Sequence, residues 1–425
     1  MRRRRFLQGA AGAAGTAGAA AFGLGGCGAE AGDGEPLKVL AASYDKSVGA
    51  SIVRQWKEFA ARFEKKHPDI AVDLEFVSFS KIDKVLSQRV RDGRAPDIAQ
   101  SNSFADYAEE HRLYSAPELF SIPAQADFIA SFARAGEVSF TQYGIPCLAS
   151  VPRLFYNRKL FAKAGIPGPP GSWKELASAA RALKSSGVRI PYGLQLGPEA
   201  AEDEALAWMT AGEGGYVSSG GYDFRSPANV RTLEWLRDEL VEPGLAGPDP
   251  AKLTRTQAYG GFLRGQVGML LAHPVLLGTA HAAHVPYGHG PFPARRGGPA
   301  APVGLNDWMM AFRSGGRRKD AGKFLTALYA DMKSPMGYLG GQGTLPVRTS
   351  TLEKLRDDRE QRELWKFIDD MGDAEFQPVS RSSWDTVKPA VRERIGKAVL
   401  PGGKPSSVLS GLQHTADKAE IAARR

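Results

Sequence analysis

The chain has 425 residues, of which 43% are hydrophobic and 24% charged, so it is long enough for more than one buried core. Its formal net charge is +9, but four positive charges belong to Arg2–Arg5, which leaves a mild +5 for the remainder. The sequence also has no concentrated basic tract of the kind found in nucleic-acid-binding proteins, which argues against a nucleic-acid partner.

The first 26 residues have the features of an export signal rather than of an amphipathic start to the fold. Arg3–Leu7 fits the twin-arginine pattern, and an Ala/Gly-rich apolar stretch follows over Gly9–Leu24. That stretch is too short and too rich in glycine to remain in a bilayer as a permanent helix. Because small residues precede Cys27, the segment resembles a bacterial lipoprotein signal peptide, and we expect Cys27 to carry lipid at the outer face of the cytoplasmic membrane.

The other cysteine, Cys147, is then unpaired, and its apolar surroundings predict a buried structural thiol. Residues 27–36 contain no bulky apolar side chain and are expected to form a flexible tether. The remaining residues exceed one comfortable core, so two domains are expected.

The first part of this region alternates between strand and helix patterns. Apolar residues occupy every second position over 70–76, and large apolar residues recur at helical spacing before Pro68. The expected strands are 37–41, 70–76 and 95–99, and the expected helices include 52–63 and 81–91. This order is typical of a parallel sheet covered by helices, an α/β fold. Helices are also expected over 319–332, 351–371, 387–399 and 407–422.

Parallel sheets of this kind bind ligands at the carboxyl ends of their strands. The loops that follow the first and third expected strands are polar and short. Tyr44, Asp45, Asn102 and Ser103 in these loops are therefore candidate ligand contacts.

A series of short motifs in a fixed order carries a family resemblance. They are Arg62–Ile70, Gly93–Ile98, Gly144–Pro146, Leu154–Phe161, Ser172–Leu176, Gly265–Met269 and Gly343–Arg348. The series resembles the extracellular sugar-binding proteins of ABC importers, the maltose-binding-like group (family 1).

The resemblance implies a two-lobed periplasmic-binding-protein-like fold of type II, in which each lobe is a central sheet flanked by helices. The expected lobes are 37–146 plus about 276–343, and 147–275 plus about 344–425, with a ligand cleft at the hinge. It further implies a monomer without cofactors that captures a mono- or oligosaccharide by hinge closure. The partners would be membrane permease subunits, which work with a separate ATPase because the chain has no phosphate-binding loop.

Sugar binding requires flat apolar faces together with polar groups that bridge neighbouring hydroxyls. Relatives place cleft-lining segments at positions that match Trp308, Trp384 and His273, the last of which stands where a tryptophan is expected. Trp208 and the turn residues Asn306 and Asp307 are further candidates, although burial and ordinary turn chemistry explain them equally well. Ser150 and Gly343 complete the expected ligand contacts.

Three alternatives to sugar capture remain open. A metal importer would use His281, His284 and His289, but no acidic residue lies between Val267 and Asn306 to complete a site, so no metal is expected. A polyamine or polyol phosphate is another possible solute, and Arg348 is a candidate contact for a phosphate. A glycoside hydrolase could use a carboxylate of 202–204, yet an acidic helix start explains that run without catalysis.

Overall fold

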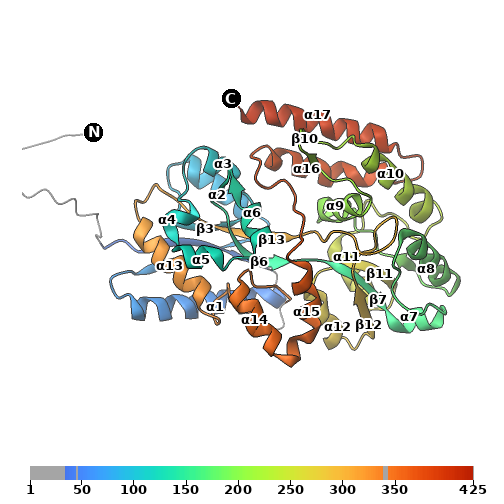
Figure 1. Cartoon of the computed structure of the whole chain (residues 1–425), viewed down its shortest axis with the longest axis horizontal. Coiled ribbons are helices and arrows are strands. Elements are labelled where there is room, and N and C mark those ends of the chain that lie inside the picture. Colours follow the sequence, from blue (N-terminus) through green and yellow to red (C-terminus); the bar gives the residue numbers. More distant parts are fainter. Residues whose placement is uncertain (1–33, 45, 338–342, 425) are drawn as a thin grey trace, which may run out of the picture. The chain divides into compact units, whose positions relative to one another are not determined.

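The computed structural model describes residues 34–44, 46–337 and 343–424. The expected signal peptide, Cys27 and the candidate Asp45 lie outside the described residues. Pro36–Arg425 forms one unit that contains two main sheets (Figure 1).

The first sheet has the strand order β2-β1-β3-β13-β6. β1 runs parallel to β2 and β3, as the sequence predicts, whereas β13 is antiparallel to both of its neighbours. The strands are β1 (Leu37–Ser43), β2 (Val72–Ser78), β3 (Ile98–Ser101), β6 (Ile145–Ser150) and β13 (Leu305–Ala311).

Helices cover this sheet because their apolar stripes face it. Trp56, Phe59 and Phe63 of α1 are buried, and the two phenylalanine rings pack edge-on against Phe324 of α13. The helices of this part are α1 (Lys46–Lys66), α2 (Ile82–Arg91), α3 (Ala105–Glu109), α4 (Ala116–Leu119), α5 (Ile122–Ala126), α6 (Ala130–Ala135) and α13 (Arg318–Ala330). A small hairpin pairs β4 (Glu137–Val138) with β5 (Thr141–Gln142).

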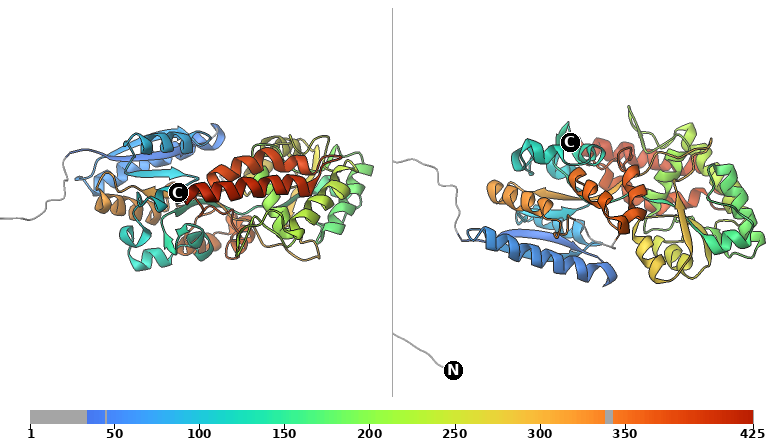
Figure 2. Two further views of the ribbon diagram at one scale, coloured as in Figure 1. Left: turned by 90° about the horizontal axis from the view of Figure 1, so that it is seen from above. Right: turned by 60° about the horizontal axis from the view of Figure 1, so that its bottom comes forward.

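The second sheet has the order β12-β7-β11-β8 and mixes parallel with antiparallel pairs. Its strands are β7 (Arg153–Asn157), β8 (Ile190–Tyr192), β11 (Val267–Ala272) and β12 (Tyr287–Gly290). The helices around it are α7 (Arg158–Lys163), α8 (Trp173–Ser185), α9 (Ala201–Ala211), α10 (Pro227–Trp235), α11 (Arg255–Leu263), α12 (Val275–Ala282), α16 (Trp384–Arg394) and α17 (Pro405–Ala423). Short strands β9 (Val217–Ser218) and β10 (Gly221–Tyr222) form a hairpin, and α16 and α17 lie side by side (Figure 2).

The chain passes between the two sheets three times. It crosses between β6 and β7, again between β12 and β13, and finally through α14 (Thr349–Asp357) and α15 (Arg362–Asp370) before it reaches α16. The two-lobed α/β architecture expected from the sequence is therefore present. β12 belongs to the second sheet although its residues fall within the range expected for the first lobe; the lobe boundaries stay a prediction.

The single helix expected over 351–371 is instead two helices. The chain turns at Asp358, whose side chain accepts a hydrogen bond from the Glu360 backbone N–H at 2.9 Å and starts a short 3₁₀ turn over Arg359–Gln361. A side chain that caps its own backbone in this way competes with helix continuation, which periodicity alone does not reveal.

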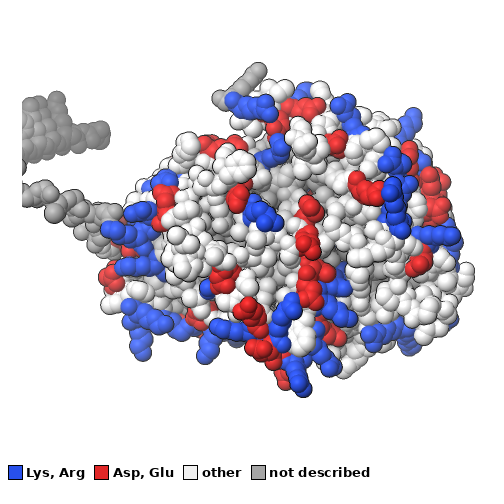
Figure 3. All heavy atoms as spheres, in the orientation of Figure 1, with Lys and Arg blue, Asp and Glu red and all other residues white. Residues whose placement is uncertain are grey.

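Basic and acidic side chains are interspersed over the face drawn in Figure 3, so neither sign of charge dominates it. Within the described part of the chain, no helix is both long enough and apolar enough to cross a membrane.

Candidate functional site

A pocket lies where two of the crossing segments meet the second sheet. Pro152 comes from the first crossing, and Val303 and Leu305 come from the second, just where β13 begins. The remaining lining residues are Gln195, Ala200, Asp203, Glu204, Arg255, Leu271 and His273. A polar pocket beside the crossing segments is where a solute could contact both lobes at once.

One wall of the pocket is the first turn of α9, which carries three carboxylates, two of which, Asp203 and Glu204, line the pocket. Oε1 of Glu204 accepts hydrogen bonds from Tyr192 Oη at 2.9 Å and from Trp208 Nε1 at 3.0 Å. Its Oε2 accepts one from Gln195 Nε2 at 3.2 Å. Burial raises the pKa of Glu204 to about 7, with Asp203 adding to the effect, although the Trp208 and Tyr192 donors oppose it.

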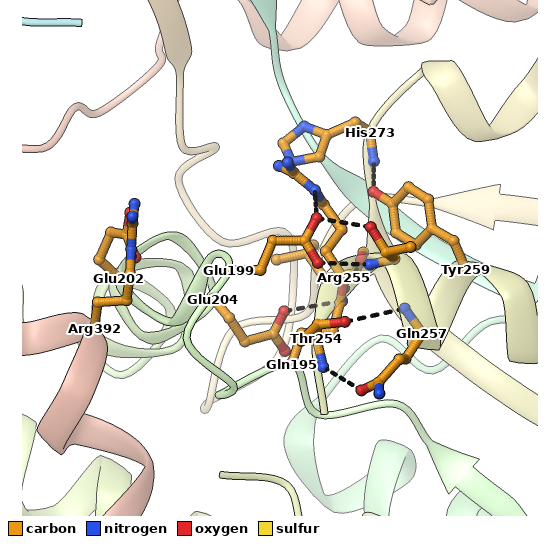
Figure 4. A network of polar contacts seen from close by, with 12 residues as sticks. Gln195, Glu199, Glu202, Glu204, Thr254, Arg255, Gln257, Tyr259, His273 and Arg392 are labelled. Carbon is orange, nitrogen blue, oxygen red and sulfur yellow. Dashed lines mark hydrogen bonds and ion pairs between the residues drawn. The ribbon is translucent and has the colours of Figure 1, made fainter. Parts of the chain in front are cut away.

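The opposite wall is the first turn of α11, where the helix start is fixed by its capping residues. Thr254 and Gln257 form a reciprocal capping box, which places Arg255 at the first position of the helix. The Arg255 Nε lies 3.7 Å from Oε1 of Glu199, and both oxygens of that carboxylate also accept hydrogen bonds from Thr256 (Figure 4). Glu199 thereby orients the guanidinium at the edge of the pocket.

His273 sits at the end of β11 and meets the candidate Ser150 from the end of β6. Ser150 Oγ lies 2.9 Å from His273 Nδ1, and the His273 backbone N–H donates to Tyr259 Oη at 2.8 Å. Burial, followed by the charge of Arg255, lowers the pKa of His273 to about 3, so the imidazole is neutral at physiological pH. Two predicted residues from different sheets are thus brought together.

The candidate Gly343 packs against the turn that follows His273. Its φ is +71°, and a Cβ at this position would lie 2.1 Å from the backbone N of Val275. Only glycine fits so close to the Pro274–Val275 backbone.

We expect Gly343→Ala to lower the free energy of unfolding by about 2–3 kcal/mol, since it combines an unfavourable φ with overpacking. Gly402→Ala is the matched control, because Gly402 has φ +76° but no atom within 4 Å of the added Cβ. Urea unfolding of both variants separates the close contact from the backbone strain, and equal losses would show that the contact contributes nothing.

The first sheet contributes a second polar group at its carboxyl ends. The Tyr44 hydroxyl donates to Asp307, and Gln100 Nε2 donates to Tyr44 Oη at 2.6 Å and to Asp307 Oδ2 at 2.8 Å. Burial raises the pKa of Asp307 to about 6. The Tyr44 ring stacks on Phe79 with centroids 5.1 Å apart, and both rings are partly exposed. Tyr44 and Asp307 are candidates from the sequence, whereas Gln100, which connects them, is not among those candidates.

The other two candidates of the first sheet make different contacts, Asn102 with α2 of the same lobe and Ser103 with α16 of the second lobe. Asn102 donates to Asp83 through both its backbone N–H and its side chain, while Ser103 Oγ donates to Asp385. Asp385, Lys388 and Arg392 occupy one face of α16. The Ser103–Asp385 hydrogen bond therefore joins the two lobes directly. Asn306 instead donates to the adjacent backbone carbonyl of Asp307.

The three candidate tryptophans are buried, with exposed fractions of 0% for Trp208, 1% for Trp308 and 2% for Trp384. Trp208 packs among Trp173, Trp235 and Phe292 and donates to Glu204, and Trp384 Nε1 donates to Gln377 at 3.1 Å. In this conformation none of them offers a ring face for stacking. Trp208 reaches the pocket only through the carboxylate that it holds.

The histidine cluster and Arg348 are separate from the pocket. His281 and His284 are exposed at the end of α12, and no group of three potential metal-ligating side chains is assembled among the described residues. Arg348 forms an ion pair with Asp127 and donates to the Tyr329 carbonyl at 3.0 Å. Its guanidinium is thus already engaged in the first lobe.

The charge of Glu204 should make stability depend on pH. A folded-state pKa raised to about 7 means that the folded protein binds this proton more tightly, so stability falls as the pH rises through 7. Relative to Glu204→Gln, the wild type should lose on the order of 1 kcal/mol between about pH 6 and pH 8.5. Urea unfolding at both pH values measures the difference, and parallel pH profiles for the two proteins would contradict the assignment.

Comparisons with known proteins place this geometry in a family context. The family described as bacterial extracellular solute-binding protein matches residues 49–333. A putative binding protein of Brucella abortus is 24% identical over 92% of this chain and 94% of its own length. The sn-glycerol-3-phosphate-binding periplasmic protein UgpB of Agrobacterium fabrum is 27% identical over 51% of each chain. A solute-binding protein of an ABC transporter from Thermotoga lettingae, solved with α-D-tagatose, superimposes with a TM-score of 0.75 and 19% identity, covering 91% of this chain and all of that one.

Proposed function

The chain belongs to the bacterial extracellular solute-binding proteins, and from this premise we propose that it captures a carbohydrate by hinge closure for an ABC importer. The family binds small molecules and works with ABC permeases rather than catalysing reactions. The observation that carries the proposal is the polar pocket beside two crossing segments, lined by Asp203, Glu204 and Arg255.

The chemistry of the pocket supports a polyhydroxylated ligand. A hydroxyl group can donate to a carboxylate and accept from a guanidinium, and the pocket holds both kinds of partner. The Tyr44–Phe79 stack supplies the partly exposed aromatic surface at the first sheet that the buried tryptophans do not. The Thermotoga lettingae neighbour, whose ligand is a sugar, is consistent with this class of solute.

Closure would act through contacts that join the two lobes. Ser103 already donates to Asp385 across the lobes, and a solute that touches both sides would add further contacts to the closed state. Ligand binding then shifts the population toward the closed form, which the permease would recognise.

A thermal-shift screen tests the proposal on the mature chain, residues 27–425, with Cys27→Ser to prevent lipidation. The panel contains mono- and oligosaccharides, polyol phosphates, polyamines and divalent metals. A carbohydrate present at 100 times its Kd should stabilise the protein by about 2.7 kcal/mol without being consumed. Stabilisation by metals or polyamines alone, or cleavage of a glycan, would refute sugar capture.

A polyol phosphate is the second candidate ligand, because of the similarity to UgpB over half of each chain. The phosphate would have to approach Arg255, since Arg348 is paired with Asp127 away from the pocket. The same screen separates the two candidates.

We also propose that Cys27 anchors the protein to the membrane as a lipoprotein. The support is the sequence alone, a twin-arginine start followed by small residues ahead of the cysteine. Cys27→Ser should move the protein from the membrane fraction to the soluble exported fraction, whereas Cys147→Ser should leave it at the membrane. An unchanged distribution of the Cys27 variant would refute the anchor.

A further inference from the structure

Two adjacent carboxylates of the pocket, Asp203 and Glu204, have no ion-pair partner among the described residues. Their neighbour Glu202 differs, because it forms a bidentate pair with Arg392 of α16. The acidic start of α9 thus divides into one neutralised carboxylate behind the pocket and two that line it.

Glu204 is held entirely by neutral donors. Tyr192, Gln195 and Trp208 occupy both of its oxygens, and the residue is 3% exposed. Such donors fix the position of the carboxylate and leave its charge uncompensated. Above its pKa of about 7, the ionised Glu204 repels any ligand anion placed beside it, because little solvent intervenes.

Asp203 presents the second charge. One of its oxygens accepts from Gln377, which lies on the segment that leads into α16. The charged groups around Asp203 are Glu202 on its own helix, Lys388 and Arg392 on α16, and Arg255 on α11. Arg392 is neutralised by Glu202, and Lys388 also faces Asp307 and Asp385, so neither cation belongs to Asp203 alone.

Among the described residues that line the pocket, Arg255 alone carries a positive charge, and it shares that charge with Glu199. His273 is neutral, as derived above. The lining therefore combines two acceptors, one partly neutralised guanidinium and a neutral imidazole.

We infer that this pocket selects a neutral polyol with adjacent hydroxyls and rejects the phosphate esters of the same polyol, with Asp203 and Glu204 as the discriminating residues. The inference rests on the proposed function and names its substrate class. A hydroxyl can donate to Asp203 while a neighbouring hydroxyl accepts from Arg255. A phosphate monoester carries about −1.5 to −2 charge and offers mainly acceptors, so it meets two carboxylates, and the Arg255 guanidinium that could receive it is already shared with Glu199.

Isothermal titration calorimetry of the Cys27→Ser mature chain tests the inference with matched pairs of probes. The pairs are glucose with glucose 1-phosphate, galactose with galactose 1-phosphate, and glycerol with sn-glycerol 3-phosphate. Measurements at about pH 8 keep Glu204 ionised, because its pKa is about 7. We expect the neutral member of at least one pair to bind and its phosphate to bind at least about tenfold more weakly. Asp203→Asn should reduce this discrimination, and Glu204→Gln should reduce it further.

The outcomes separate the two proposals. If a phosphate binds the wild type as tightly as its neutral partner, the inference fails while solute capture stands. If the wild type binds the neutral polyol more tightly than its phosphate, and the folded Asp203→Asn variant does so equally well, these residues do not cause the discrimination. The wild-type comparison needs no variant, so it decides the first point even if a substitution prevents folding. If no carbohydrate, in these pairs or in the thermal-shift panel, binds, the proposed function fails and the inference fails with it.

Discussion

Trp208→Ala is expected to lower the free energy of unfolding by about 3–5 kcal/mol, among the largest losses for any single substitution in this chain. Trp208 is fully buried, and its ring lies within 6 Å, centroid to centroid, of Trp173, Trp235, Tyr192 and Phe292. Truncation opens a cavity at the centre of this cluster. It also removes a donor from the buried Glu204, which adds the cost of an incompletely satisfied carboxylate.

Chemical denaturation followed by circular dichroism measures the loss. Trp208→Phe is the informative companion, since it keeps most of the ring packing but removes the Nε1 donor. It should cost less than the alanine variant, yet should still raise the pKa of Glu204 by removing a donor to the ionised form. If Trp208→Ala is as stable as the wild type, this cluster does not hold the second lobe together.

The second large effect is expected on ligand affinity. Arg255→Ala should weaken carbohydrate binding by about ten- to a hundredfold, because it removes a charge-assisted donor worth about 1.5–3 kcal/mol. The substitution should change stability little, since Arg255 is one third exposed in its ion pair with Glu199.

Arg264→Ala is the matched control, because Arg264 lies exposed at the other end of α11. Calorimetric titration of the two variants with the carbohydrate found in the screen should separate them. Equal affinities for both variants would place the binding site elsewhere.

The sequence was sufficient to predict the parallel core of the first sheet, because alternation over 70–76 and helical spacing in α1 both report burial. Ser150 and His273 are each named as candidates from the sequence, but their contact is seen only in the structure. Whether each tryptophan lines the cleft was harder to predict, because an aromatic residue has the same sequence pattern in a cleft and in a core. Trp308, packed on Phe104, illustrates this.

Other parts of the site could not be predicted from the sequence. Arg255 carries no local signal apart from its capping box, and its role depends on Glu199, more than fifty residues away. Gln100 looks like an ordinary strand residue until β13 brings Asp307 beside it. The acidic run over 202–204 is evident in the sequence. Only the packing determines that Glu202 pairs with Arg392 while Asp203 and Glu204 line the pocket.

We propose above that a carbohydrate binds in the pocket beside the crossing segments. Hydrogen–deuterium exchange of the mature chain, with and without the carbohydrate found in the screen, tests it most directly, because bound ligand suppresses local opening. Slower exchange is expected in 195–204, 254–259 and 271–275, which surround the pocket. Unchanged exchange in these segments, with protection appearing elsewhere, would contradict it.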